Sequence, residues 1–81
     1  MDINYIKNII IQAIKEKGKI EVYEEILEEK ISSLEIDSLD FFYILIEIEN
    51  KLDIEFNEKI YQINTINELI NLAYEIKKEK F

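Results

Sequence analysis

The sequence contains no cysteine, histidine, arginine or proline and only one glycine. The absence of cysteine excludes a disulfide framework, a thiolate nucleophile and zinc-finger spacing, so a hydrophobic core must hold the fold. The absence of histidine removes the usual general base near neutral pH and the commonest metal ligand. No EF-hand spacing with its required glycine occurs either. The composition therefore argues against an enzyme that relies on its own side chains and against a dedicated metal site.

Long hydrophobic runs and basic segments are also absent. The longest isoleucine run, Ile9–Ile11, is far shorter than the roughly 20 residues that span a membrane. The first residues, Met1–Asn4, lack the basic region of a signal peptide. The net charge of −8 repels the phosphates of nucleic acids. We therefore expect a cytoplasmic protein that binds neither membrane nor nucleic acid.

The 81 residues are 48% hydrophobic and 35% charged, which is too apolar a composition for a disordered segment. This length predicts one globular domain over residues 1–81 with a small core. The charge is concentrated in the middle of the chain. Residues 21–58 carry thirteen acids and two lysines, a net of −11, whereas residues 1–20 and 59–81 carry +2 and +1. Such an acidic segment favours docking onto a basic surface of a partner.

Apolar residues at helical spacing predict the first helix. Asp2 is its expected N-cap, and Gly18 is expected to end it in the left-handed conformation. The predicted buried stripe consists of Ile3, Ile6, Ile10, Ala13 and Ile14. Residues 19–36 are expected to form a long loop with one helical stretch, a loop length that is often functional.

The second helix is expected over Asp37–Leu52, with Asp37 and Asp40 as a loose capping box. One stripe fits a core, and it consists of Phe41, Ile44, Leu45, Ile48 and Leu52. A second, shorter stripe of Leu39, Phe42 and Ile46 lies about 100° away around the helix. Because the first stripe already supplies a core face, the second is expected to be exposed or half-exposed and to contact a partner.

A connector at Asp53–Phe56 and a short helix at Asn57–Tyr61 follow. Thr65 and Glu68 form a capping box for a last helix, whose C-terminal end is expected to carry Lys77, Lys78 and Lys80. Its predicted stripe is Ile66, Leu69, Ile70, Ala73 and Ile76. The pattern predicts an all-α fold, a small four-helix bundle with three longer helices and one short one.

The tripeptide Asp37-Ser38-Leu39, followed by Asp40, stands at mid-chain before an acidic helix. In a helical chain of this length it resembles the attachment motif of the acyl carrier proteins. The segment Ile63–Ile66 also resembles the family's sequence before its last helix. The resemblance covers nearly the whole chain and implies that Ser38 carries a 4′-phosphopantetheine arm derived from coenzyme A. A chain without histidine or cysteine needs such an imported thiol for acyl transfer.

The resemblance implies a carrier that is not itself an enzyme and acts as a monomer. Its implied partners are a phosphopantetheinyl transferase and acyl-transfer, synthase or ligase enzymes with basic docking patches. Asp37 and Asp40 are implied to bind the transferase and its divalent metal. The residues expected to recognise partners are Asp37, Leu39, Asp40, Phe42, Tyr43, Ile46, Glu47, Glu49 and Asp53. The implied pathway is fatty-acid, related lipid or polyketide biosynthesis.

The chain departs from the family in several places. Glu35 stands where a glycine or another small residue is common, Tyr43 replaces a glutamate and Ile46 replaces a methionine. These departures leave open an aminoacyl, D-alanyl or other specialised carrier. A different class, an acidic helical interaction module in which Ser38 is only a capping residue, also remains open. A hydrolase with paired carboxylates is disfavoured, because nothing in so small a chain suggests a pocket.

Overall fold

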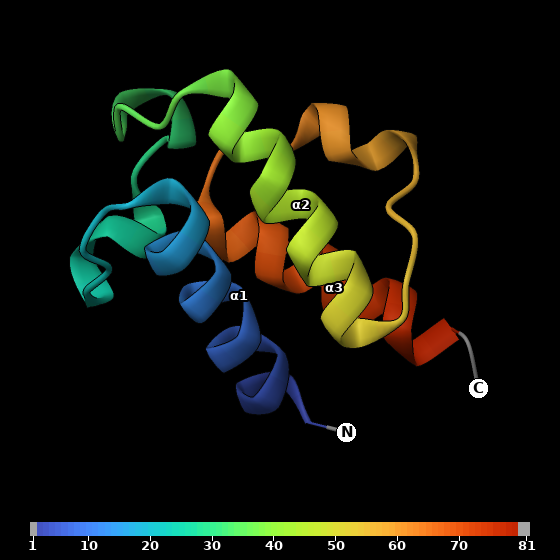
Figure 1. Ribbon diagram of the computed structural model, residues 1–81. Helices are drawn as coiled ribbons and strands as arrows, with labels where there is room; N and C mark the ends of the chain where they lie inside the picture. Colours follow the sequence, from blue (N-terminus) through green and yellow to red (C-terminus); the bar gives the residue numbers. More distant parts are fainter. Residues whose placement is uncertain (1, 80–81) are drawn as a thin grey trace.

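A computed structural model describes residues 2–79, in which α-helices and 3₁₀ helices are joined by loops with no β-strand among them (Figure 1). This confirms the predicted all-α fold. The α-helices are α1 (Ile3–Gly18), α2 (Ser38–Leu52) and α3 (Ile66–Glu79). Three short 3₁₀ helices join them: η1 (Glu24–Glu28), η2 (Ile31–Ser33) and η3 (Glu58–Gln62). The predicted short fourth helix is η3, one residue further along than expected. Lys80, expected at the end of the last helix, lies outside the described residues.

The two ends of α1 are held by different means. The side chain of Asp2 accepts a hydrogen bond of 3.0 Å from the backbone N–H of Tyr5, which confirms the predicted N-cap. The prediction for Gly18 is wrong, because Lys19 is the residue in the left-handed conformation, with φ of 57°. A Cβ atom at Gly18 would lie only 3.1 Å from Cδ1 of Ile44 on α2. The glycine therefore lets α1 approach α2 closely.

The segment from 19 to 37 is a loop, as predicted, although it holds two 3₁₀ turns instead of one helical stretch. Ile26 and Leu27 of η1 are buried in the core. The backbone N–H of Ile31 donates a 2.7 Å hydrogen bond to the carbonyl of Asn64. Lys30 and Thr65 pair in an isolated β-bridge. The long loop is thus fixed to the chain just before α3, which holds the start of α2 in place.

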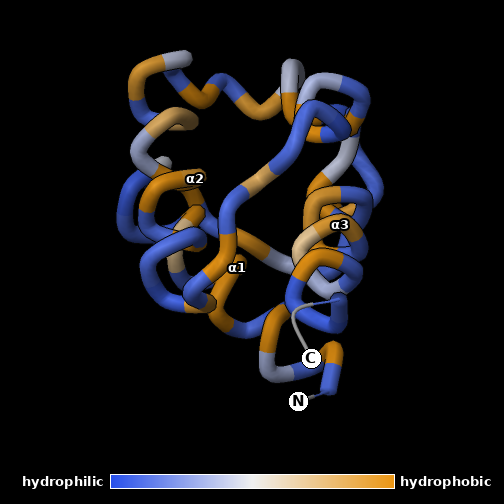
Figure 2. The backbone as a smooth tube through the Cα atoms, turned by 90° about the vertical axis from the view of Figure 1, so that its right-hand side faces the viewer, coloured by the Kyte–Doolittle hydropathy of each residue, from blue (hydrophilic) through white to orange (hydrophobic). Residues whose placement is uncertain are grey.

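The core fills the space between the three α-helices, and α1 packs against both α2 and α3. Figure 2 shows short hydrophobic stretches recurring along all three helices. Within residues 2–79 no polar or charged residue is buried. The predicted stripes are largely correct, but Ile3 is exposed and the unpredicted Leu72 is buried. The core cluster comprises Ile6, Ile10, Ala13, Ile14, Ile26, Leu27, Ile44, Ile48, Leu52, Ile54, Ile66, Leu69, Ile70 and Ala73.

The predicted capping box of α3 is present. The backbone N–H of Glu68 donates to Oγ1 of Thr65 over 3.1 Å, and Oε1 of Glu68 accepts from the N–H of Thr65 over 2.9 Å. The same oxygen also accepts from the N–H of Asn64 over 2.6 Å. These backbone hydrogen bonds, the bond from Asn64 first, favour the ionised carboxylate and lower the pKa of Glu68.

The lowered pKa of Glu68 predicts a pH-dependent contribution to stability. The charged carboxylate stabilises the fold above the ordinary glutamate pKa of about 4.3, and this contribution is lost as the pH falls through the lower pKa of the folded state. Replacement Glu68→Gln should therefore lower the thermal midpoint most at neutral pH. Thermal melts of both proteins from neutral to acidic pH should show their difference shrinking. A difference independent of pH would mean that the charge plays no part.

Candidate functional site

Ser38 is the first residue of α2 and its side chain is exposed. Asp37 occupies the N-cap position, but its side chain makes no capping hydrogen bond, so the predicted capping function of Asp37 is wrong. The first turn of α2 is instead closed by a backbone hydrogen bond of 2.8 Å, which the N–H of Phe41 donates to the carbonyl of Asp37. The first turn of α2 therefore keeps amide groups and the positive end of its dipole available beside Ser38.

The backbone just before this serine is strained. Glu35 has a φ of 59°, in the left-handed region that favours glycine. A residue with a side chain costs roughly 1–2 kcal/mol in this conformation. A glycine at this position would adopt the same conformation without that cost. The sharp turn at Glu35 brings the chain from η2 into α2 at Ser38.

Ser38 borders a groove of about 480 Å³ on the surface. The groove is lined by Ser38, Phe41, Phe42, Leu45, Ile46, Glu49, Phe56, Ile60 and Tyr61. The α2 residues come from both predicted stripes, whereas the last three come from the connector and η3. Seven of the nine lining side chains are aromatic or aliphatic, and the one charged group is Glu49. The groove can therefore shelter an apolar chain, but it offers little to a strongly charged one.

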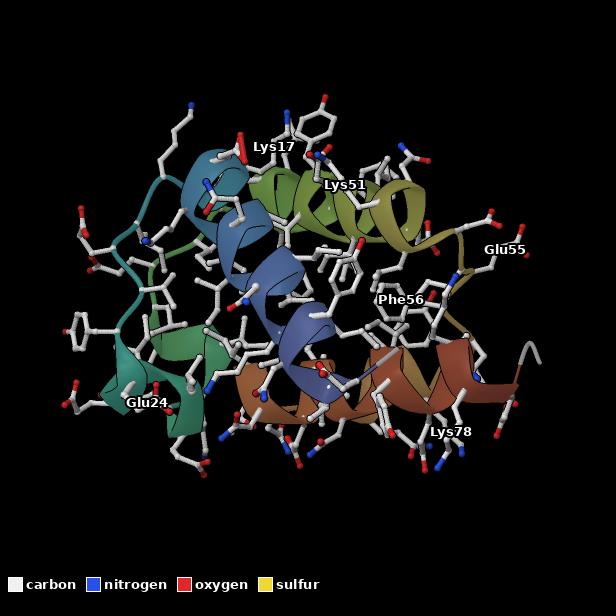
Figure 3. The ribbon with its side chains drawn as sticks, turned by 90° about the horizontal axis from the view of Figure 1, so that it is seen from below. Lys17, Glu24, Lys51, Glu55, Phe56 and Lys78 are labelled. Carbon is white, nitrogen blue, oxygen red and sulfur yellow. The ribbon has the colours of Figure 1, made fainter. Side chains whose placement is uncertain are left out.

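Glu49 fixes one wall of this groove. Its Oε2 atom accepts a 2.8 Å hydrogen bond from the backbone N–H of Phe56, in a half-buried position. Figure 3 shows Phe56 pointing inward from the connector towards the space between α2 and α3, while Glu55 points outward. Glu49 is one of the residues predicted to recognise partners, and its position in the sequence gives no sign of this bond. Glu49 thus holds Phe56 against the groove, whatever else it contacts.

The predicted partner residues fall into two groups. Phe42, Ile46 and Glu49 line the groove with Ser38. Leu39 and Tyr43 are 57% and 48% exposed and lie outside it. The others outside the groove lining are Asp37 and Asp53, which are exposed, and Asp40 and Glu47, which are half-buried.

Exposed aromatic and aliphatic side chains gather at the N-terminal half of α2. Leu39 and Phe42 are each 57% exposed, so the second stripe of the helix does face solvent near its start. The rings of Phe42 and Tyr43 lie 6.2 Å apart, tilted by 52°. Across the groove, Tyr61 of η3 is 88% exposed. This is an apolar surface next to Ser38, set in the most acidic part of the sequence.

The C-terminal end of α2 is tied to α3. Nζ of Lys77 donates a 2.7 Å hydrogen bond to the backbone carbonyl of Leu52, in a half-buried position. Asp53 then turns the chain with a left-handed φ of 54°. This bond satisfies one of the last carbonyls of α2 and fixes the end of α2 that lies beyond the groove.

A second hollow of about 300 Å³ also borders Ser38. It lies between η2, the start of α2 and η3, and it is lined by Ile31, Ser32, Ile36, Ser38, Phe41, Ile60, Ile63 and Asn64. This lining is more polar than that of the groove, because Ser32 and Asn64 contribute to it.

Two further findings bear on what the chain can do. Within residues 2–79 no group of three or more acidic side chains is arranged to hold a metal ion. Over the same residues, no helix has the length and apolar character needed to cross a membrane.

A small helical fold that exposes a serine at the start of its second long helix, beside an apolar groove, suits a carrier with a covalently attached arm. Comparison with protein-family models agrees: residues 5–73 match the family described as "Phosphopantetheine attachment site". The match covers most of the chain, so the chain belongs to this family of phosphopantetheine-dependent carriers. Covalent 4′-phosphopantetheine is the cofactor of the family.

Among curated proteins, the chain is similar to the "Acyl carrier protein homolog" of Mycoplasma pneumoniae (strain ATCC 29342 / M129 / Subtype 1). The two are 42% identical over 53 residues, which cover 64% of this chain and 63% of the length of that protein. No solved structure matches the chain significantly. Together with the family match, this similarity supports the predicted membership in the acyl carrier protein family.

Proposed function

We propose that the chain is an acyl carrier protein that holds acyl groups as thioesters on a 4′-phosphopantetheine arm at Ser38. It presents them to partner enzymes in fatty-acid, related lipid or polyketide biosynthesis. The observation that carries the proposal is the exposed Ser38 at the start of α2, within the matched residues 5–73 and at the edge of an apolar groove. The arm supplies a thiol, which this cysteine-free chain lacks.

The residues around Ser38 suit the attachment of this arm. Oγ of Ser38 attacks the phosphorus of coenzyme A that bears the pantetheine. A phosphodiester forms, the bond to 3′,5′-ADP breaks, and the hydroxyl proton passes to a base of the transferase. Ser38 contributes an exposed oxygen and needs no activating neighbour within the chain. The first-turn amides of α2, which Asp37 leaves uncapped, stabilise the negative charge of the phosphodiester.

The acidic middle of the chain supports the proposed partners. Residues 21–58 carry a net charge of −11, which attracts basic patches on a phosphopantetheinyl transferase and on acyl-transfer, synthase or ligase enzymes. Asp37 and Asp40 flank Ser38, and we assign them to contact with the transferase and its divalent metal. In this proposal residues 1–81 form one carrier domain that acts as a cytoplasmic monomer without catalytic activity of its own.

Intact-mass measurement tests the proposal directly. After incubation with coenzyme A and a phosphopantetheinyl transferase of broad specificity, the protein should gain the mass of one phosphopantetheine group. A chain whose mass stays unchanged with a transferase that modifies a known carrier in parallel would instead be an acidic interaction module. An aminoacyl or D-alanyl carrier is the second candidate, and the mostly apolar groove beside Ser38 speaks against a charged cargo.

Replacing Phe42 with alanine separates docking from folding. Because its side chain is 57% exposed, the change should alter the free energy of unfolding by no more than about 0.5 kcal/mol. Loss of an exposed aromatic beside Ser38 should weaken binding to the transferase, since aromatic residues are enriched among those that carry binding energy. Titration calorimetry and thermal melts of both proteins check this. Unchanged binding would remove Phe42 from the docking surface.

A further inference from the structure

Two hollows open beside Ser38, and the same side chains separate them. The groove of about 480 Å³ and the hollow of about 300 Å³ share three lining residues: Ser38, Phe41 and Ile60. Of these three, Phe41 from α2 and Ile60 from η3 are the bulky side chains, and we take them as the wall between the two spaces. Both side chains are half-buried and pack against the core, which fixes their positions.

We propose that Phe41, together with Ile60, sets the length of acyl chain that this protein shelters. The inference rests on the proposed function, because the cargo must be attached at Ser38. An apolar chain that starts beside Ser38 enters the groove, whose lining is mostly aromatic and aliphatic. The aromatic ring of Phe41 keeps this chain out of the second hollow. The preferred cargo is therefore an unbranched apolar acyl chain short enough to end within the groove.

The chemistry of the groove lining supports an apolar cargo. Glu49 is the one charged group there, and its Oε2 atom already accepts the backbone N–H of Phe56. The second hollow is less suitable, since Ser32 and Asn64 border it. Joining the two spaces would enlarge the available volume by more than half. Removing the ring of Phe41 should therefore admit a distinctly longer chain.

The thermal midpoint of the loaded protein reports how much of the acyl chain is buried in the groove. Each methylene that leaves water on entering the groove stabilises the folded state, whereas methylenes beyond its end remain in water and contribute nothing. Because the groove is open to solvent, each methylene in it is only partly buried. Each added pair of methylenes should therefore raise the thermal midpoint by roughly 3–6 °C, and the rise should stop when the groove is full. The chain length at which the midpoint becomes constant reports the length limit.

The experiment loads wild type, Phe41→Ala and Tyr74→Ala with saturated unbranched acyl groups of increasing length, transferred with the arm from acyl-coenzyme A. Intact mass confirms loading, and each midpoint is compared with that of the same variant carrying the arm alone. Tyr74→Ala is the matched control, because Tyr74 is also a half-buried aromatic that packs against the core but lines neither the groove nor the second hollow. We expect the midpoint of Phe41→Ala to become constant at a chain at least one methylene pair longer than in the other two proteins.

Other outcomes are equally decisive. The proposal is overturned if the limit in Phe41→Ala equals that of wild type, or if Tyr74→Ala extends it equally. It is also overturned if chain length has no effect on the wild type. Should Phe41→Ala fail to fold, Ile60→Ala opens the same wall from η3 and must extend the limit instead. Failure of the wild type to accept any arm at Ser38 would overturn the proposed function, which is a different result.

Discussion

Substitution of Ser38 by alanine is expected to abolish the gain in mass that a phosphopantetheinyl transferase produces. The attachment needs an exposed oxygen at the start of α2, and alanine offers none. The fold should hardly change, because exposed substitutions usually alter the free energy of unfolding by about 0.5 kcal/mol or less. Circular dichroism and intact mass, measured on the same samples, separate loss of the site from loss of the fold.

The two other serines supply matched controls. Ser32 and Ser33 are also exposed, but they lie in η2, and Oγ of Ser33 donates a 2.8 Å hydrogen bond to the carbonyl of Lys30. Neither starts an α-helix or follows an aspartate at the N-cap. Ser32→Ala and Ser33→Ala should therefore accept the arm as readily as wild type. A Ser38→Ala protein that still gains the full mass would show that the arm is attached elsewhere.

Local signals in the sequence correctly predict where a helix begins when a side chain next to that point makes a capping hydrogen bond. Asp2 caps α1, and Thr65 and Glu68 form the capping box of α3, as their spacing indicates. Helical periodicity also identifies most of the buried residues, because a stripe at intervals of three and four residues has to face a core. These features depend on neighbours within a few positions, which is why the sequence alone is sufficient.

Predictions that depended on distant contacts were less successful. The conformation of Gly18 could not be predicted from its neighbours, because the reason for a glycine is the close approach of Ile44 from α2. Lys19 takes the left-handed turn instead, a conformation that lysine adopts at a cost. One local prediction also failed, since Asp37 has the right position for a cap, yet it makes no capping bond. Spacing identifies a possible hydrogen bond but does not decide whether the side chain turns towards it.

In the candidate site too, some features can be predicted from the local sequence and others cannot. The position of Ser38 and the exposure of Leu39 and Phe42 follow from the tripeptide and from the second stripe of α2. The groove does not, since Phe56 and Tyr61 reach it from the connector and η3. Aromatic residues in a segment without helical periodicity were the available signal, but a pattern along the sequence cannot tell which helix they face.

Substitution of Ile48 by alanine should strongly lower the stability of the fold. Ile48 lies on the buried face of α2 and is fully inaccessible to solvent. Truncating a buried isoleucine costs about 2–5 kcal/mol, because apolar contacts are lost and a cavity remains. In a protein of this size that loss lowers the thermal midpoint by roughly 8–40 °C. Phe42→Ala removes a larger side chain from the same helix, yet it should cost far less because Phe42 is mostly exposed.

The combined measurement tests whether α2 divides its functions between two faces. At temperatures where Ile48→Ala is still folded, it should accept the phosphopantetheine arm at the wild-type rate, because Ser38 and the groove lining are unaltered. Phe42→Ala should show the reverse, with a normal midpoint and slower modification. Equal losses of stability in the two variants would place Phe42 in the core. Slower modification of a folded Ile48→Ala protein would show that the buried face also controls the presentation of Ser38.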